Sequence, residues 1–427
     1  MRVFLESIGC RLNQSEIEKI GYQFRQAGWD VTANAEDADL VVVNTCTVTA
    51  NAAADSRQII RKAHRKGNAG IIVTGCWSTI QPSDAAQLPG VVRVFANQDK
   101  EEIVHSWLEL PEYLERDIEY RREPLPGYRK RTRAFVKAQD GCDQHCTYCI
   151  TRLARGNSRS RSIQKIMLDI RSAVLGGTKE IVLSGVQLGS WGRDFSTPLD
   201  LKDLISAMLN DSDIARIRLS SIEPWDIDED LIRLWDNPRL CRYLHIPLQS
   251  GSEPVLKRMA RRFSPQNYAE RIAMIRGYSP EIAISTDVIA GFPGETEGEY
   301  EETLEFIKCI SFSGGHAFTF SSRPGTAAAL MDNQIPENIK RQRNTVIRAI
   351  FNESSLAYRE KFCGKNGEVL WEKSEAIEGQ EFLLEGLTDN YIRVRANHDQ
   401  AILNTISKVR LTRLARNGMF GMLELSK

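Results

Sequence analysis

The order of apolar and polar positions divides the chain into three segments. In residues 1–120, three short apolar runs are strand-like, and each ends at a cysteine. Patterns with helical spacing follow the first two runs, over 13–29 and 49–66, with Asn13 as the expected cap of the first helix. This alternation of strands and helices predicts an α/β domain built on a parallel sheet.

The second segment, residues 133–362, repeats the alternation several times. Strand-like runs lie at 132–139, 180–186, 215–222, 243–249, 284–292 and 316–322. Helical patterns lie at 163–177, 201–211, 267–278 and 299–310, and a long polar helix closes the segment at 337–362. Six repeats of this kind predict a partial (β/α)6 barrel, in which functional residues lie at the carboxyl ends of the strands.

The third segment, residues 363–427, changes to short alternating runs separated by turn signals, which predict a small β-barrel. A basic stretch with two prolines, 121–133, is expected to link the first segment to the second. The predicted fold class is therefore α/β for the first two segments, with an all-β domain after them.

Composition narrows the class of protein. The chain has 427 residues, which favours two or three domains, and 42% hydrophobic with 26% charged residues is typical of soluble globular proteins. Basic and acidic residues number 56 each, so no net charge attracts a polyanion. No leader and no membrane span are predicted, so we expect a cytoplasmic protein without a membrane partner. Nine cysteines in a reducing compartment favour metal ligands or buried thiols over disulfides.

The stretch "DGCDQHCTYCI" carries Cys142, Cys146 and Cys149 within eight positions. Iron-sulfur cubanes normally take four cysteine thiolates, so a loop with three leaves one iron open. Two alternatives remain: a zinc site that includes His145, although no second ligand pair follows, and a redox CxxC pair, which does not explain Cys142. The spacing favours a three-ligated iron-sulfur cluster.

The strand-end cysteines of the first segment form a second candidate set. Cys10, Cys46 and Cys76 each close one of the three predicted strands. The carboxyl ends of parallel strands meet at one edge of a sheet, so we expect these thiols to lie together. The alternative is that each is a buried strand-end thiol, which is common for free cysteine.

The pattern CxxxCxxC after the first strand of a βα barrel, with Tyr148 before its last cysteine, resembles the radical S-adenosylmethionine superfamily. With the strand-end cysteines before it and the small barrel after it, the chain resembles the methylthiotransferase family over nearly its whole length. The resemblance implies an α/β domain over 1–120, a radical barrel over 133–362 and a TRAM-like RNA-binding β-barrel over 363–427. It also implies S-adenosylmethionine and two 4Fe-4S clusters, one on each cysteine set.

Several stretches are similar to the branch of this family that acts on N6-threonylcarbamoyladenosine beside the tRNA anticodon: "GCRLNQSE", "NTCTVT", "VLSGVQLGSWG", "LSSIEP" and "HIPLQSGS". The implied reaction replaces the hydrogen at adenine C2 of position 37 with a methylthio group. One S-adenosylmethionine would supply the methyl group and another a 5′-deoxyadenosyl radical. Thr151 and Arg152 depart from the usual aliphatic-proline pair after the last cysteine, which puts local substrate or cosubstrate contacts in doubt.

Three alternatives to this function stay open. Two share the chemistry and act on isopentenyladenosine in tRNA or on a ribosomal-protein aspartate, and the third is an RNA-binding protein with structural metal sites. The resemblance implies the tRNA anticodon stem-loop and a flavodoxin- or ferredoxin-like electron donor as partners. The sulfur source is not indicated, and no catalytic side chain is predicted.

Residues at the predicted strand ends are weaker candidates for cofactor binding, and ordinary turn chemistry explains them equally well. They are Gly185, Ser220, Ser221, Glu223, Gln249, Gly291 and Gly294. Basic runs in all three segments suggest a patterned surface for an RNA backbone: "RKAHRK", "YRKRTR", "ARGNSRSR" and "KVRLTRLAR".

The remaining aromatic, cysteine and histidine residues carry simpler expectations. Stacking on an RNA base could use an aromatic ring, and the candidates are Trp191, Trp225 and Tyr128. Three thiols are expected to serve packing alone, and two histidines to be satisfied core residues: Cys241, Cys309, Cys363, His245 and His316.

Overall fold

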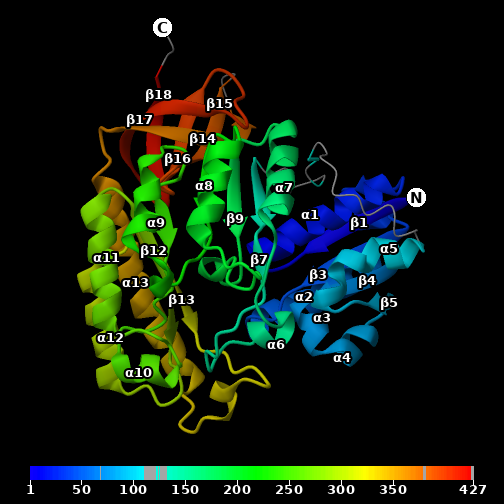
Figure 1. Ribbon diagram of the computed structural model, residues 1–427, viewed down its shortest axis with the longest axis horizontal. Coiled ribbons are helices and arrows are strands. Elements are labelled where there is room, and N and C mark those ends of the chain that lie inside the picture. Colours follow the sequence, from blue (N-terminus) through cyan, green and yellow to red (C-terminus); the bar gives the residue numbers. More distant parts are fainter. Residues whose placement is uncertain (68, 110–121, 124, 126–131, 378–380, 425–427) are drawn as a thin grey trace.

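The computed structural model describes residues 1–67, 69–109, 122, 123, 125, 132–377 and 381–424. Figure 1 shows an α/β domain in blue, a central barrel in green and yellow, and a closed β-barrel in orange and red. This arrangement confirms the predicted fold class. No helix within these described ranges has both the length and the apolar character that crossing a membrane requires.

The N-terminal domain contains a five-stranded parallel sheet in the order β2-β1-β3-β4-β5. Its strands are β1 (Arg2–Ser7), β2 (Asp30–Thr32), β3 (Leu40–Thr45), β4 (Gly70–Gly75) and β5 (Val91–Val94). Its helices are α1 (Arg11–Gln26), α2 (Ala50–Lys66), α3 (Cys76–Ile80), α4 (Pro82–Ala86) and α5 (Ile103–Leu108). The three predicted strands are confirmed as β1, β3 and β4, whereas the short strands β2 and β5 at the sheet edges were not predicted.

Strand β3 explains why this sheet is stable. All six of its residues are buried, as expected for a central strand of a parallel sheet covered on both faces. Leu40 and Val42 pack with the cluster on the α1 side, while Val41 and Val43 pack with the cluster on the opposite side. Successive side chains of a strand point to opposite faces, so one apolar run serves both clusters.

The predicted helix cap at Asn13 is wrong. Helix α1 begins at Arg11, so Asn13 lies inside its first turn. The Asn13 amide instead donates to the main-chain oxygens of Ile8 at 2.8 Å and Thr45 at 3.0 Å. These oxygens belong to the segments after β1 and at the end of β3, so the side chain joins two strand ends.

The central barrel has six parallel strands, and all six predicted runs are confirmed. They are β6 (Arg133–Lys137), β9 (Glu180–Ser184), β10 (Arg216–Leu219), β11 (Tyr243–His245), β12 (Ala283–Ala290) and β13 (Gly314–Thr319). The strands pair as β10-β9-β6 and β11-β12-β13, and single bridges from Ile217 to Leu240 and from Ser221 to His245 join the two groups. The result is an open barrel of the predicted (β/α)6 type.

Helices cover the outside of this barrel (Figure 1). They are α7 (Ile163–Leu175), α8 (Leu201–Asp211), α9 (Glu229–Arg233), α10 (Glu253–Arg258), α11 (Pro265–Tyr278), α12 (Glu297–Ile310) and α13 (Glu337–Glu360). Short elements near the first strand are β7 (Gln139–Asp140), α6 (Thr151–Arg155) and β8 (Arg159–Ser160). In β10, Ile217 and Leu219 join the main apolar cluster, which leaves Arg216 and Arg218 on the other face of the strand.

The C-terminal domain is a closed barrel with the strand order β14-β15-β16-β18-β17. Its strands are β14 (Asn366–Ala376), β15 (Phe382–Thr388), β16 (Arg393–His398), β17 (Ile406–Ala415) and β18 (Gly418–Leu423). Arg216 donates to the main-chain oxygen of Glu368 at 2.9 Å, and Arg218 donates to that of Asp389 at 2.8 Å. The domain therefore binds the central barrel near the amino ends of its strands.

Candidate functional site

The cysteine loop begins directly after β7 and is held by main-chain contacts. Gly141 has φ +68°, and a Cβ at this position would lie 1.8 Å from the main-chain oxygen of Asn157. The Gly141 N–H donates to Asp140 Oδ1 at 2.9 Å, and the Cys142 N–H donates to the oxygen of Gly156 at 3.1 Å. Only glycine fits this start of the loop, because any side chain would collide with backbone.

The three thiols of this loop are close enough to affect one another. Burial raises the pKa of Cys142 to about 12, and Cys149 and Cys146 both contribute to the increase. Burial also raises the pKa of Cys149. A bound metal centre would keep such thiols as thiolates, because metal binding releases the protons of cysteine ligands.

His145 does not join the three thiols. Its ring is exposed, and both ring nitrogens lie within 2.7 Å of Arg152 Nη1. A zinc-bound imidazole uses one ring nitrogen for the metal and usually donates from the other to an acceptor, which a guanidinium is not. The arrangement favours the all-cysteine ligand set over the zinc site with His145.

Two buried side chains beside the loop were missed by the sequence analysis. Arg261 Nη1 lies 3.7 Å from Cys146 Sγ, and its guanidinium is held by Glu223 and the main-chain oxygen of Pro247. Gln187 Oε1 lies 3.3 Å from Cys142 Sγ. Gln187 belongs to the stretch "VLSGVQLGSWG", whereas no pattern distinguishes Arg261 from other arginines.

A small polar cavity of about 240 Å³ adjoins the loop. It is lined by Asp143, Gln144, Ser158, Gln187, Ser190, Arg193, Asp194 and Arg262. Burial raises the pKa of the nearby Asp226 carboxyl, and a hydrogen bond from the Gln187 side chain opposes that increase. The lining of this cavity is therefore polar, which suits a polar ligand.

The second cysteine set lies at the carboxyl ends of three neighbouring strands. Cys10 follows β1, Cys46 follows β3 and Cys76 is the first residue of α3, directly after β4. Gly9 has φ +105°, and a Cβ there would lie 2.8 Å from Cys46 Sγ. Gly75 has φ +106° and packs equally tightly against the end of β3. Two glycines thus let the cysteine-bearing segments approach one another closely.

The thiols of the second set also interact. Burial raises the pKa of Cys46 to about 11, and Cys76 and Cys10 add to the increase. Asn97 Nδ2 lies 3.5 Å from Cys76 Sγ, and Cys10 Sγ lies 3.5 Å from Asn13 Oδ1. The structure therefore brings together three thiols that lie far apart in the chain.

The chemistry of both sets fits a three-ligated iron-sulfur cluster. All six cysteines are free thiols, and each set has three thiols without a fourth. Among the residues that the structure describes, no group of three His, Cys, Asp or Glu side chains is spaced for a single metal ion. A cubane distributes its ligands over several irons, so it requires a wider triangle than one ion does.

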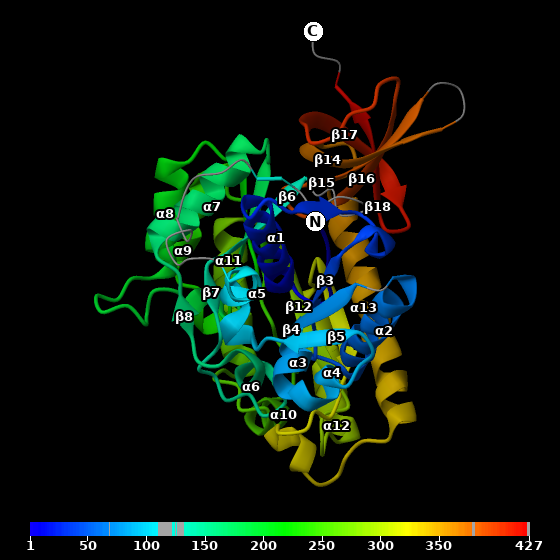
Figure 2. The ribbon, with the colours of Figure 1, turned by 90° about the vertical axis from the view of Figure 1, so that its right-hand side faces the viewer.

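The edges that carry the two sets face each other. Arg323, after β13, donates to Thr47 Oγ1 at 2.6 Å, and Asn97 donates to the main-chain oxygen of Ala154 at 2.6 Å. Helices α3 and α6 are adjacent at this boundary (Figure 1), and both views place it away from the C-terminal β-barrel (Figure 2). The site is thus an interface between the N-terminal domain and the carboxyl end of the central barrel.

The weaker candidates fall into two groups. Near the loop, the Gly185 N–H donates to Ser220 Oγ at 3.3 Å, Glu223 pairs with Arg261, and Ser221 bridges to β11. These four candidates lie at the carboxyl ends of β9 and β10, beside the cysteine loop.

The other three candidates serve the backbone. Gln249 has φ +72°, and its N–H donates to the main chain of Asp287 at 2.8 Å. Gly291 and Gly294 have φ +73° and +71°, and a Cβ on Gly291 would lie 2.5 Å from the Lys340 side chain. Gly291 is therefore explained by its close approach to α13.

The aromatic candidates are corrected in part. Trp191 is fully buried in the apolar cluster of the central barrel, and its Nε1 donates to the oxygen of Arg161 at 2.9 Å, which removes it from the three candidates for stacking on a base. Trp225 is half-buried with Arg261 5.1 Å from its ring. Tyr128 lies outside the described residues.

The predictions for the other thiols and histidines are mixed. Cys241 is buried as predicted, but Cys309 and Cys363 are exposed, so the packing prediction is wrong for both. His245 is satisfied by contacts of its ring nitrogens with Ser285 Oγ at 2.8 Å and with Asp287 Oδ2 at 3.1 Å. His316 is exposed, so the prediction that it is a core histidine is wrong. A single polar residue in a strand does not reveal which face it occupies.

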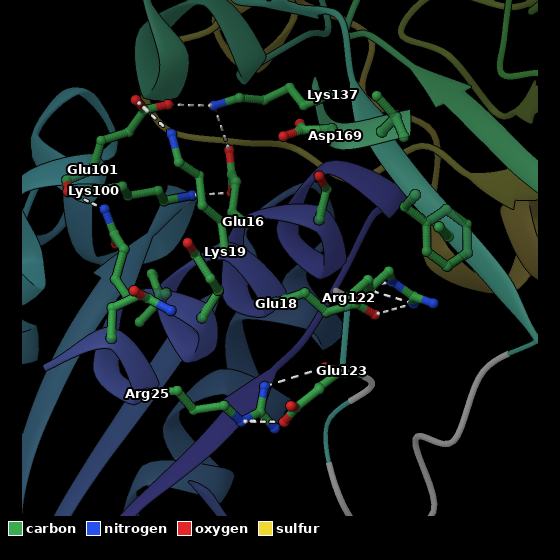
Figure 3. A pocket seen from close by; sticks show the side chains of 18 of the residues that line it. Glu16, Glu18, Lys19, Arg25, Lys100, Glu101, Arg122, Glu123, Lys137 and Asp169 are labelled. Carbon is green, nitrogen blue, oxygen red and sulfur yellow. Dashed lines mark hydrogen bonds and ion pairs between the residues drawn. The ribbon is translucent and has the colours of Figure 1, made fainter. Parts of the chain in front are cut away.

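A separate cavity of about 240 Å³ lies between α1 and β6 (Figure 3). Its charged side chains pair with one another: Lys19 with Glu101 at 3.1 Å, and Arg122 with Glu18 at 2.9 Å. This cavity is a seam between the two domains, and the cysteine sets do not line it.

Comparison with known proteins gives matches to two families. Residues 136–307 match the family described as "Radical SAM superfamily", and residues 2–97 match "Uncharacterized protein family UPF0004". A solved structure, the radical S-adenosylmethionine methyltransferase TsrM from Kitasatospora setae, matches with a TM-score of 0.58 and 13% identity. It covers 88% of this chain and 81% of that chain, and at this identity the likeness concerns the fold alone.

Curated relatives match over nearly the full length. Threonylcarbamoyladenosine tRNA methylthiotransferase MtaB of Bacillus subtilis (strain 168) is 35% identical, covering 96% of this chain and 93% of the relative. MtaB of Thermotoga maritima is also 35% identical, with 93% and 91% covered. The tRNA-2-methylthio-N(6)-dimethylallyladenosine synthase of Alkaliphilus oremlandii is 30% identical, with 96% and 90% covered. The chain is therefore an enzyme of the radical S-adenosylmethionine methylthiotransferase family.

Proposed function

We propose that this enzyme converts N6-threonylcarbamoyladenosine at position 37 of tRNA to its 2-methylthio derivative. The observation that carries the proposal is the meeting of two three-cysteine sets across one domain interface. Relatives named for this nucleoside are 33–35% identical to the chain, against 30–32% for relatives named for dimethylallyladenosine, and this small difference supports the choice of substrate.

Membership of the radical SAM superfamily implies one 4Fe-4S cluster and S-adenosylmethionine. The loop cysteines, Cys142, Cys146 and Cys149, would hold that cluster. A second cluster would be held by Cys10, Cys46 and Cys76. Together these groups would supply radical chemistry for a carbon that carries no acidic proton, a step for which no general base suffices at neutral pH.

The chain's own residues would position and shield the reactants. Arg261 presents a buried positive charge beside Cys146, and Glu223 holds it there through two hydrogen bonds. The cavity next to Gln187 would take a polar part of S-adenosylmethionine, with Gly185 and Ser220 beside it. Gln249, Ser221, Gly291 and Gly294 would act by shaping the backbone around this space.

The C-terminal β-barrel would contact the RNA backbone. On β17, Lys408 and Arg410 are exposed while Val409 between them is buried, and Arg393 and Arg395 repeat the pattern on β16. The alternation places Lys408, Arg410 and Arg393 on the outside of an apolar core, while Arg395 is paired with Glu385 at 2.6 Å. Contacts of Lys and Arg with phosphates position a nucleic acid without specifying its sequence.

The test is anaerobic reconstitution followed by nucleoside mass spectrometry. The enzyme would be incubated with S-adenosylmethionine, a flavodoxin-type electron donor and a sulfide source. Three substrates would be compared: tRNA carrying N6-threonylcarbamoyladenosine, tRNA carrying isopentenyladenosine, and small ribosomal subunits. We expect a methylthio product in the first alone, whereas product only in either of the others would overturn the substrate assignment.

The metal content separates this enzyme from an RNA-binding protein with structural metals. Two cubanes correspond to about eight irons per chain, with matching acid-labile sulfide. A protein purified without oxygen that holds zinc and no iron would overturn the proposal.

A further inference from the structure

A buried ion network joins the two cysteine sets. Arg155, at the end of α6, has only 2% of its side chain exposed. Its guanidinium donates to Asn13 Oδ1 at 2.6 Å, to Glu16 Oε1 at 2.9 Å and to Asp140 Oδ1 at 2.8 Å. Asn13 and Glu16 belong to the N-terminal domain and Asp140 to the central barrel, so one side chain spans the interface. The interpretation of "ARGNSRSR" as a basic surface run is therefore wrong for this arginine.

Two partners of Arg155 hold the cysteine segments themselves. Asp140 accepts the N–H of Gly141, the residue directly before Cys142. Asn13 donates to the main chain of Ile8 and of Thr45, close before Cys10 and Cys46 in the sequence. The Arg155 guanidinium therefore connects the backbone of both cysteine sets, through Asp140 on the side of the central barrel and through Asn13 on the side of the N-terminal domain.

The network carries more positive than negative charge. Lys100 lies 2.5 Å from Glu16, and Lys137 lies 3.6 Å from Glu16 and 3.4 Å from Asp140. Figure 3 shows Glu16 from the seam, between Lys100 and Lys137. With Arg155, three cations face two carboxylates.

The ion pair of Glu101 and Lys19, at the edge of the network, does not change this balance of charge. Glu101 also approaches Lys137, at 3.6 Å, but it is itself paired with Lys19. An unpaired charge in a protein interior is strongly unfavourable, so the excess requires a negative partner.

The thiols of the N-terminal domain are next to this excess charge. Burial alone would lower the pKa of Arg155, but Glu16 and then Cys76 raise it above the ordinary range, and Cys10 contributes in the same direction. Asn97 donates both to Cys76 Sγ and to the main chain immediately before Arg155. Besides Glu16 and Asp140, the acidic groups that act on Arg155 are Cys76 and Cys10, so their thiolates can supply the negative charge that the excess requires.

We propose that Arg155 is a positioning residue that fixes the separation of the two cysteine sets, and that the excess positive charge of its network stabilises a negatively charged group on Cys10, Cys46 and Cys76. The proposal rests on the second cluster of the proposed function. It also predicts the sign of an effect: removing a positive charge from the network lowers the reduction potential of that cluster, and removing a negative charge raises it.

The test uses the full chain with Cys142, Cys146 and Cys149 replaced by Ala, so that only the N-terminal set binds iron. One-electron reduction adds negative charge to a cluster. Arg155→Met removes a nearby positive charge and is expected to lower the midpoint potential in an anaerobic titration followed by electron paramagnetic resonance. Glu16→Gln removes a negative charge and is expected to raise it. A purely structural role would not give shifts of opposite sign.

Two further variants separate charge from geometry. Arg155→Lys keeps the charge but loses the planar fork, so its potential should stay closer to that of the parent than the potential of Arg155→Met does. With the loop cysteines restored, Arg155→Lys should form less methylthio product per S-adenosylmethionine cleaved. Arg216→Met removes an equally buried interdomain arginine at the opposite end of the barrel and should leave the potential unchanged.

The outcomes are distinguishable. Shifts of the same sign in Arg155→Met and Glu16→Gln, or no shift in either, would overturn this inference while the second cluster stands. If the parent protein with the loop cysteines replaced bound no iron, the second cluster of the proposed function would be refuted, and this inference with it. Circular dichroism and iron content of Glu16→Gln and Arg155→Lys keep the test decisive should Arg155→Met fail to fold.

Discussion

The two ends of the central barrel both use buried arginines, but for different purposes. At the amino end, Arg216 and Arg218 donate mainly to main-chain oxygens of the C-terminal β-barrel, and Arg218 is balanced by Glu180, with both side chains fully buried. At the carboxyl end, Arg155 binds side chains whose charges leave a positive excess beside thiols. Burial alone therefore does not distinguish Arg155 from Arg218; under the proposal above, the difference lies in the thiols beside the Arg155 network.

The largest effect is expected from removing the loop thiols at the carboxyl end. Replacing Cys142, Cys146 and Cys149 with Ala should abolish cleavage of S-adenosylmethionine, because the three ligands of the family's cluster are lost. Chromatography of 5′-deoxyadenosine measures this loss. Cys309→Ala changes an exposed thiol on α12 and serves as the control, which should retain cleavage. Cleavage at the parental rate in the triple variant would contradict the ligand assignment.

The second set should separate cleavage from product formation. With Cys10, Cys46 and Cys76 replaced by Ala, 5′-deoxyadenosine should still form, while the methylthio nucleoside falls below detection. The physical reason is that the loop set and its surroundings in the central barrel remain intact. Full product formation by this variant, measured by mass spectrometry of the tRNA nucleosides, would refute the two-cluster assignment.

The amino end should respond through stability. Arg218→Met leaves Glu180 as a buried carboxylate with only two arginines about 4.0 Å away, Arg133 and Arg216. Breaking a buried ion pair by removing one partner costs about 3–5 kcal/mol in the free energy of unfolding. Urea unfolding measures the loss, and the double variant Arg218→Met/Glu180→Leu should recover part of it. Cleavage of S-adenosylmethionine per folded molecule should not change, since the loop lies at the other end.

The smallest effect is expected at the exposed rim of the same interface. Arg242 pairs with Asp389 at 2.6 Å, and 38% of the Arg242 side chain but only 17% of the Asp389 side chain is exposed, so Arg242→Ala should cost about 1 kcal/mol. Burial raises the pKa of Asp389, but hydrogen bonds from Arg242 lower it below its ordinary value. Because the folded protein holds this carboxyl pKa below its value in the unfolded chain, the ionised carboxylate stabilises the fold at any pH above the unfolded pKa. This stabilisation is lost as the pH falls through the folded pKa. The difference between parent and variant, measured by urea unfolding, should therefore disappear in acid.

Much of the fold could be predicted because it depends on local periodicity. Apolar runs indicate the buried strands β3 and β9, and helical spacing of apolar residues indicates α7 and α12. These elements and the order of the domains can therefore be predicted from the sequence. Short edge strands such as β2 and β5 were missed, because three or four residues carry too little periodicity. Asn13 suits a helix cap by its residue type, but its contacts with two main-chain oxygens, of Ile8 and Thr45, give it another role.

The sequence by itself determined the composition of the site: three thiols within eight residues, three more at strand ends, and the alternation that places them at carboxyl edges. Only the tertiary structure decided that these edges face each other, that Arg155 is buried between them and that Trp191 is packed inside the barrel. The reason is physical. Periodicity along the chain reflects whether a residue is buried and on which face of its element it lies. Which edges face each other, and how the charges between them balance, depend on which elements of separate domains meet.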